Sequence, residues 1–355
     1  MKLSKIIGKI LLTPYISYAK KGNVEDFFDY ICNELEDENL YPSFRIRRKD
    51  SRMTPINTDF CKSDNIAIVL QGPIRYKDDF TLNSIRFYKE LYCDAKIILS
   101  TWKDEPESLL DDFKRENIFI VKNDKPIFSG NLNVNYQIVS SRAGIKKAKE
   151  LDAKYVVKTR TDQRVCRPYI FNTMEGMLDF FPIETECNIN KRVIVIPTNH
   201  DNMFTPYFMS DFFYFGTTED LYNLFNVKLS NKSNEDFRDL ISRRDYSKSM
   251  FPPEIYLLKN FIKDYTNESC EDTVFEYWEC LKKYFVCMDI NMLDLFLVKY
   301  SYSHKDYCCN GDYFQDDNIN QKKTQRIGFS EWFNLYNGSM KYLKEYESQA
   351  DENFF

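Results

Sequence analysis

The chain has 355 residues with 49 basic and 54 acidic side chains, enough for one large domain or two ordinary ones. Residues 1–22 contain five lysines and no acid, so the remaining chain carries a balance of −10, which excludes a protein with a broad nucleic-acid-binding surface. No apolar run reaches the ~18 residues of a membrane span. Because the ten cysteines form no Cys-x-x-Cys pair, we expect reduced thiols in a cytoplasmic protein.

The first residues predict a short amphipathic helix. On a helical wheel, one face carries Leu3, Ile6, Ile7, Ile10 and Leu11, the opposite face carries Lys2, Lys5 and Lys9, and Pro14 ends the pattern. This arrangement is typical of helices in a membrane interface, so residues 2–12 are the predicted contact with a membrane surface. The alternatives are a helix docked on its own domain and a frayed terminus.

A second helix is expected at 24–35, followed by an arginine-rich connector. From residue 65 onward, apolar runs alternate with helical stretches. We expect strands at 66–70, 96–101, 118–121 and 155–160, and helices at 81–91, 107–115 and 133–150. This alternation predicts an α/β fold with a mostly parallel central sheet flanked by helices.

The second half of the chain is less regular. Strands are expected at 193–196, 211–216 and 284–288, and helices at 252–262, 273–284 and 329–346. The chain is therefore divided into an N-terminal helix and connector at 1–60, an α/β domain at 61–300, and a polar loop with a C-terminal helix at 301–355.

Ligands of open α/β sheets bind at the carboxyl ends of the strands, where the loops after strands one, two and four should meet. The first loop, Gln71-Gly72-Pro73, has neither the dinucleotide fingerprint nor the phosphate loop. Gly72 permits a ligand to approach the backbone closely, and a plain strand-to-helix turn is the alternative. Trp102 after the second strand either stacks on a base or sugar ring or is a buried anchor.

The sharpest chemical signal is Arg160-Thr161-Asp162 at the end of the fourth strand. Asp162 suits a divalent cation or a ribose and Arg160 suits a phosphate, because a departing nucleoside diphosphate needs its charge neutralised. The familiar Asp-x-Asp pair is incomplete, since Gln163 follows Asp162. Alternatively, Asp162 caps the next segment and pairs with Arg160 or Arg164.

Three further residues are candidates near the nucleoside diphosphate, two for its charge and one for a metal ion. Arg75 and Arg164 are candidates for the local positive potential that a diphosphate requires. His304 is a candidate to complete a metal site with Asp162, and a structural or surface histidine is the alternative.

Asp211 and Glu254 are the carboxylates predicted for proton transfer from an acceptor hydroxyl. Asp211 alternatively binds backbone N–H groups at a turn, and Glu254 alternatively complements a helix N-terminus. At the start of the helix 133–150, Asn131 and Asn135 are candidates for ligand contact. Asn135 is expected on a face away from the apolar stripe, and Asn131 or Asn133 is expected to cap the helix.

Several segments, taken in order over residues 64–300, resemble the WavE-type lipopolysaccharide-synthesis family of bacterial glycosyltransferase-like proteins. They are IAIVLQGPI (66–74), IILSTW (97–102), NVNYQIVS (133–140), KTRTD (158–162) and SDFFYFG (210–216). The resemblance implies a GT-A-like nucleotide-binding fold in the domain at 61–300. It places one group of residues around the nucleotide sugar: Gln71, Gly72, Thr101, Asn135, Arg160 and Asp162. It also directs Asp211 and Glu254 toward the acceptor.

The residues and the resemblance together predict a glycosyltransferase. It would move a sugar from a nucleotide-sugar donor to a glycan or glycolipid acceptor of lipopolysaccharide or capsule, at the inner face of the bacterial inner membrane. Whether a divalent metal, Mn²⁺ or Mg²⁺, takes part stays open. The alternatives are a nucleotidyltransferase and a non-catalytic, membrane-associated partner in glycan assembly.

Overall fold

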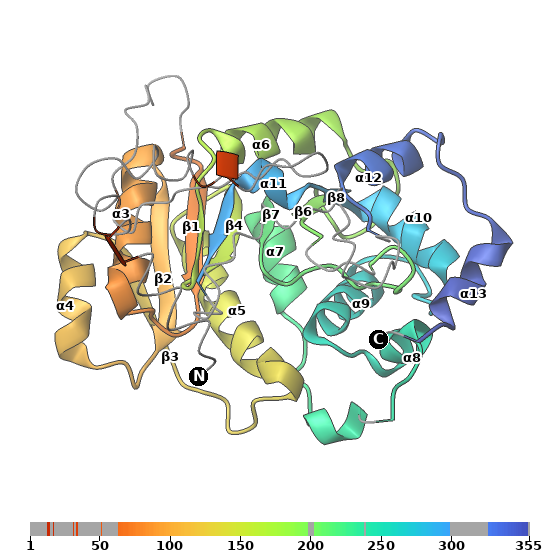
Figure 1. The fold of residues 1–355 in the computed structure, drawn as a ribbon, viewed down its shortest axis with the longest axis horizontal. Coiled ribbons are helices and arrows are strands. Elements are labelled where there is room, and N and C mark those ends of the chain that lie inside the picture. Colours follow the sequence, from red (N-terminus) through yellow and green to blue (C-terminus); the bar gives the residue numbers. More distant parts are fainter. Residues whose placement is uncertain are drawn as a thin grey trace. The chain divides into compact units, whose positions relative to one another are not determined.

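Figure 1 shows the fold of the chain in a computed structural model. The chain divides into two compact units, Met1–Arg48 and Lys49–Phe355. The structure describes residues 63–197, 202–237, 239–298 and 326–353, with a few isolated positions before residue 63. The predicted membrane-contact helix at 2–12, most of the predicted helix at 24–35, and His304 lie outside the described residues.

A seven-stranded sheet forms the centre of the second unit (Figure 1). Its strands, in spatial order, are β3 (Phe119–Asn123), β2 (Lys96–Trp102), β1 (Ile66–Gln71), β4 (Tyr155–Arg160), β7 (Tyr214–Thr217), β6 (Val193–Val195) and β8 (Phe285–Cys287). The first four are parallel, β7 is antiparallel to both neighbours, and β6 is parallel to β8. Every residue of β1 is buried, as expected for an apolar strand covered on both faces. The predicted α/β fold with a mostly parallel sheet is confirmed.

Two pairs of helices cover this sheet. On one face lie α5 (Val134–Glu150) and α7 (Thr218–Phe225), and on the other lie α3 (Phe80–Leu91) and α6 (Ile170–Phe180). Successive residues of β4 identify the two faces, since Lys158 lies over the Phe225 ring of α7 whereas Thr159 meets Tyr88 of α3. Helix α5 packs so close to the strands that a Cβ at Gly144 would overlap the side chain of Val69.

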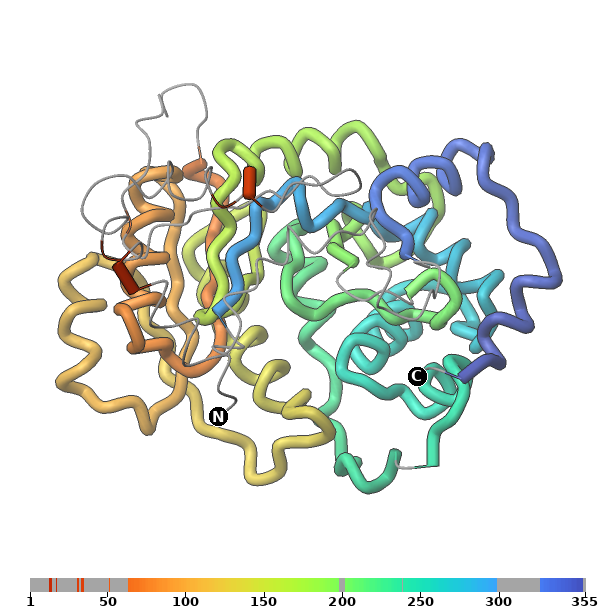
Figure 2. Tube along the Cα trace, viewed as in Figure 1, coloured from red at the N-terminus to blue at the C-terminus, as the bar shows by residue number. Residues whose placement is uncertain are grey.

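The remaining elements complete the unit around this core. The helices are α4 (Glu107–Arg115), α8 (Arg243–Ser249), α9 (Pro253–Tyr265), α10 (Val274–Tyr284), α11 (Ile290–Leu293), α12 (Phe329–Tyr336) and α13 (Glu347–Ala350). Strands β5 (Gln163–Val165) and β9 (Leu295–Leu297) form a small antiparallel sheet, which brings residues 295–298 beside the end of β4 (Figure 2). No helix among the described residues is both long enough and apolar enough to cross a bilayer.

Two local predictions are wrong, and a third, the cap of α5, is confirmed in position only. The predicted helix at 329–346 ends at Tyr336, because Gly338 takes a φ of +78° soon after it. The predicted strand at 211–216 begins only at Tyr214. At the start of α5, Asn133 occupies the capping position in a left-handed conformation, and its side chain makes no capping hydrogen bond.

Candidate functional site

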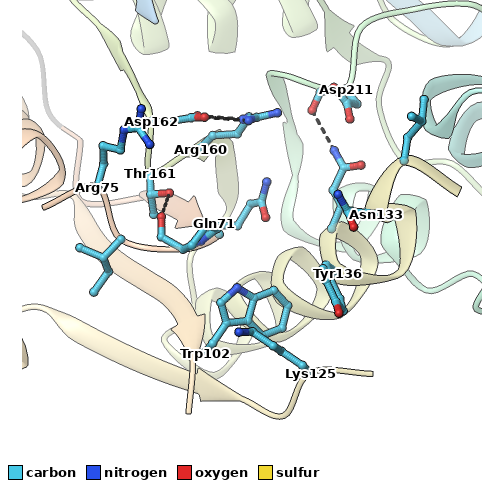
Figure 3. A pocket seen from close by; sticks show the side chains of 15 residues that line it. Gln71, Arg75, Trp102, Lys125, Asn133, Tyr136, Arg160, Thr161, Asp162 and Asp211 are labelled. Atoms are coloured by element: carbon cyan, nitrogen blue, oxygen red, sulfur yellow. Dashed lines mark hydrogen bonds and ion pairs between the residues drawn. The ribbon is translucent and has the colours of Figure 1, made fainter. Parts of the chain in front are cut away.

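A cavity of about 470 Å³ lies at the carboxyl ends of β1, β2 and β4 (Figure 3). The loops after these three strands and the first turns of α5 supply most of its wall, as the parallel arrangement predicts. The lining residues are Gln71, Gly72, Pro73, Ile74, Arg75, Trp102, Lys125, Leu132, Asn133, Tyr136, Gln137, Arg160, Thr161, Asp162 and Asp211.

One end of the cavity is aromatic. The ring of Tyr136 meets that of Trp102 edge-on at 5.4 Å between centroids, and the Nζ of Lys125 lies 5.9 Å from the Trp102 ring (Figure 3). Trp102 is 4% exposed, and Lys125 is held by an ion pair with Asp104. An aromatic wall with a cation beside it suits a planar base or a sugar ring.

The other end of the cavity is ionic. Arg160 donates from Nε and Nη2 to the two carboxylate oxygens of Asp162, at 2.9 and 2.8 Å (Figure 3). The Arg160 guanidinium also lies 5.1 Å from the Phe212 ring centroid. The pairing of Asp162 with Arg160, one of the two alternatives that the sequence left open, is therefore the arrangement in the structure.

Arg75 lies at the same end and Arg164 does not. The Nη2 of Arg75 donates to the carbonyl of Val298 at 3.2 Å, and the amide of Val298 in turn donates to the carbonyl of Asp162. Arg164 is buried, with its guanidinium over the rings of Phe80 and Phe87, and it does not line the cavity.

The turn after β1 requires glycine. Gly72 has a φ of +115°, which other residues adopt only with strain, and a Cβ there would lie 3.3 Å from the Oγ1 of Thr161. Thr161 Oγ1 donates to the carbonyl of Pro73 at 2.6 Å, which joins the loops after β1 and β4. The Oε1 of Gln71 accepts from Ser140 Oγ at 2.8 Å. These contacts pre-form the cavity floor.

Asp211 reaches the cavity from the segment before β7. Its carbonyl oxygen accepts two hydrogen bonds, from Lys158 Nζ at 2.5 Å and from Gln137 Nε2 at 3.1 Å. Its Oδ1 is buried without a hydrogen-bond partner. Burial lowers the pKa of Lys158 to about 7, while the charges of Asp211 and Glu254 oppose that effect.

Four of the predicted site residues do not line the cavity. Thr101 is buried and donates to Glu105, and Glu254 lies in the first turn of α9. Asn131 accepts from Ser230 Oγ through its Oδ1. Asn135, expected away from the core, is buried, and its amide group bonds Ser230 N, Ser230 O and Phe128 O. Asn131 and Asn135 therefore hold the loop at Ser230 against α5.

Tyr136 and Lys125 of the lining, and the supporting residue Lys158, were not among the predicted site residues. Tyr136 and Lys125 carried no signal, since each fits an ordinary helix or loop position. Lys158 did carry one, because a charge within the buried strand 155–160 needs a dedicated partner.

The described residues do not fit a divalent cation. Within residues 63–197, 202–237, 239–298 and 326–353 no three His, Cys, Asp or Glu side chains group to hold one. Both oxygens of Asp162 are committed to Arg160. A metal contact of Asp162 therefore stays a prediction.

Comparison with known proteins assigns the family. A family model described as WavE lipopolysaccharide synthesis matches residues 66–350, which include every strand and helix around the cavity. The chain belongs to the WavE lipopolysaccharide synthesis family. No curated protein matches significantly.

Two solved structures are distantly similar to this WavE-family chain. One is described as a glucose-1-phosphate thymidylyltransferase from Bacillus anthracis in complex with sucrose, at 8% identity and a TM-score of 0.27, covering 46% of this chain and 76% of that one. Another is HddC from Yersinia pseudotuberculosis, at 14% identity and a TM-score of 0.27, covering 49% and 84%. Scores this low assign neither a fold nor an activity.

Proposed function

We propose that this WavE-family chain transfers a sugar from a nucleotide-activated donor to a glycan or glycolipid acceptor in lipopolysaccharide synthesis. The supporting observation is the division of the cavity into an aromatic end, at Trp102 and Tyr136, and an ionic end, at Arg160 and Arg75. A nucleoside diphosphate sugar has the same division, since its base is planar and its diphosphate is anionic.

The proposed donor lies along the cavity. The base stacks at Trp102, and the diphosphate approaches the backbone at Gly72 and the guanidinium of Arg160. Arg160 is then shared between Asp162 and the phosphate, and its charge stabilises the leaving nucleoside diphosphate as the bond to the anomeric carbon breaks. Arg75 adds a second cation at this end.

The acceptor hydroxyl forms the new bond to the anomeric carbon and gives up its proton. Asp211 is the better candidate to accept that proton, because it lines the cavity, whereas Glu254 lies outside the lining. Glu254 remains the alternative base or an acceptor contact.

Several finer expectations belong to the same proposal. They are a GT-A-like fold, a site at the inner face of the inner membrane, membrane contact through residues 2–12, and a capsule acceptor as the alternative to lipopolysaccharide. Participation of Mn²⁺ or Mg²⁺ stays an open expectation, for which the described residues form no three-ligand group.

The test is a panel of nucleotide sugars, each with and without Mn²⁺, followed by thermal shift and by release of nucleoside diphosphate. A donor at 100 times its Kd stabilises the folded state by about 2.7 kcal/mol, which a melting curve resolves. The expected result is one donor that binds and is hydrolysed by the wild-type chain, and about 100-fold more slowly by Asp211→Asn, which leaves a measurable rate. Release of pyrophosphate from a nucleoside triphosphate and a sugar phosphate supports the nucleotidyltransferase instead. Binding of no donor supports the non-catalytic partner.

A further inference from the structure

Lys158 is a charged residue inside the central sheet. It lies in β4 between neighbours that are all buried, and its own side chain is fully buried. Its Nζ lies 5.6 and 5.5 Å from the ring centroids of Tyr214 and Phe225, and it donates to the carbonyl of Asp211 at 2.5 Å. An apolar side chain of similar volume would fill this space without the cost of burying an ammonium group. Packing alone therefore gives no reason for a lysine here.

The partner of Lys158 is the segment 210–212, which carries Asp211 to the cavity. Three side chains from three elements hold this segment. Lys158 of β4 and Gln137 of α5 both donate to the carbonyl of Asp211, and Gln163 of β5 donates to the carbonyl of Phe212 at 2.6 Å. With its carbonyl held in this way, Asp211 presents its side chain at the cavity wall (Figure 3).

We propose that Lys158 is a positioning residue that holds the backbone of Asp211 and so fixes the Asp211 carboxylate at the site of transfer. The proposal rests on the function proposed above. Lys158 does not line the cavity, and its hydrogen bond to the Asp211 carbonyl is the contact that joins it to a lining residue. The other charged groups that act on its ammonium group are Arg160, Asp162 and Glu254.

The decisive variant is Lys158→Met, which keeps an unbranched side chain one atom shorter than lysine and removes both the charge and the donor. We expect kcat for transfer to fall about 100-fold, the scale for a misplaced reacting group, with donor affinity within about twofold because the ends of the cavity are unchanged. Calorimetry gives the number of donor molecules bound per chain, and this number measures the folded fraction. Dividing kcat by that fraction prevents unfolded protein from being mistaken for lost activity. The matched control is Lys259→Met, a second buried lysine, which pairs with Asp272 away from the cavity and should leave kcat unchanged.

A double variant separates positioning from a general structural role. If Lys158 acts through Asp211, adding Lys158→Met to Asp211→Asn lowers kcat no further. If Lys158→Met instead lowers kcat about 100-fold in the Asp211→Asn chain as well, the proposal is overturned. A wild-type kcat in Lys158→Met alone or in Asp211→Asn alone would also overturn it. Gln137→Leu, which removes the other donor to the same carbonyl, should lower kcat about tenfold and provides the test if Lys158→Met does not fold.

Amide hydrogen exchange tests the same contact without any substrate. Peptides that cover residues 208–214 should exchange at least about tenfold faster in Lys158→Met than in the wild type or in Lys259→Met. Unchanged exchange refutes the positioning role even where transfer is observed. Absence of transfer by the wild-type chain with every donor refutes the proposed function instead, and the exchange result then still decides whether Lys158 holds the segment.

Discussion

The burial of Lys158 has a measurable consequence for stability. Burial lowers its pKa from the ordinary value of 10.5 to about 7 in the folded chain. The two values differ by about 3.5, and each pKa unit corresponds to 1.36 kcal/mol, so burying the charged form costs on the order of 5 kcal/mol. Lys158→Met removes that cost and also removes a charge-assisted hydrogen bond to Asp211, worth about 1.5–3 kcal/mol. The net expectation at pH 6.5 is a variant about 2–3.5 kcal/mol more stable than the wild type.

The sign of the pH dependence follows from the two protonation states. Below pH 7 the lysine is charged in both the folded and the unfolded chain, and the folded wild type bears the whole cost. Between pH 7 and 10.5 the folded chain holds fewer protons than the unfolded chain, so wild-type stability gains as pH rises. The advantage of Lys158→Met should therefore shrink by about 3 kcal/mol between pH 6.5 and 9.5.

Urea unfolding followed by tryptophan fluorescence at pH 6.5, 7.5, 8.5 and 9.5 measures this difference. The buried tyrosines and cysteines titrate equally in both proteins and cancel from the comparison. A stability difference that stays constant over this range would refute the argument, because no buried ammonium would then be losing its proton. A more stable but less active Lys158→Met would match a residue kept for activity rather than for stability.

Three further variants separate the parts of the cavity. Trp102→Ala should weaken nucleoside binding about 5- to 100-fold by loss of stacking. An unchanged affinity in calorimetry would show that the base does not stack on Trp102. Arg160→Met should weaken binding of a nucleoside diphosphate about 10- to 100-fold but spare the free nucleoside, and equal losses for both ligands would contradict a phosphate contact. Asn135→Leu removes the hydrogen bonds to Ser230 and Phe128, and should cost about 3 kcal/mol of stability in thermal melts with donor Kd unchanged. A weaker Kd at an unchanged melting temperature would instead place Asn135 at the donor.

The fold around the cavity could be predicted because its signals are local. The apolar run at 66–70 is a buried strand whichever partner it finds, and the helix at 133–150 follows from its own periodicity. Ligands of parallel sheets bind at the carboxyl ends of the strands, and this rule then placed Gly72, Trp102 and Arg160 around one cavity. The pairing of β5 with β9 carried no such signal, because it joins short segments about 130 residues apart.

Periodicity and strand direction are readable from the chain alone, and they were enough to predict the α/β class, the edge of the sheet that carries the cavity, and about half of the residues that line it. The role of each polar side chain at that edge depends instead on how distant segments pack. Tertiary packing paired Asp162 with Arg160, turned Asn135 inward to Ser230, brought Asp211 rather than Glu254 to the wall, and set Lys158 behind Asp211. The physical reason is that a polar group inside a protein must find a hydrogen-bond partner, and most of these partners come from distant parts of the chain.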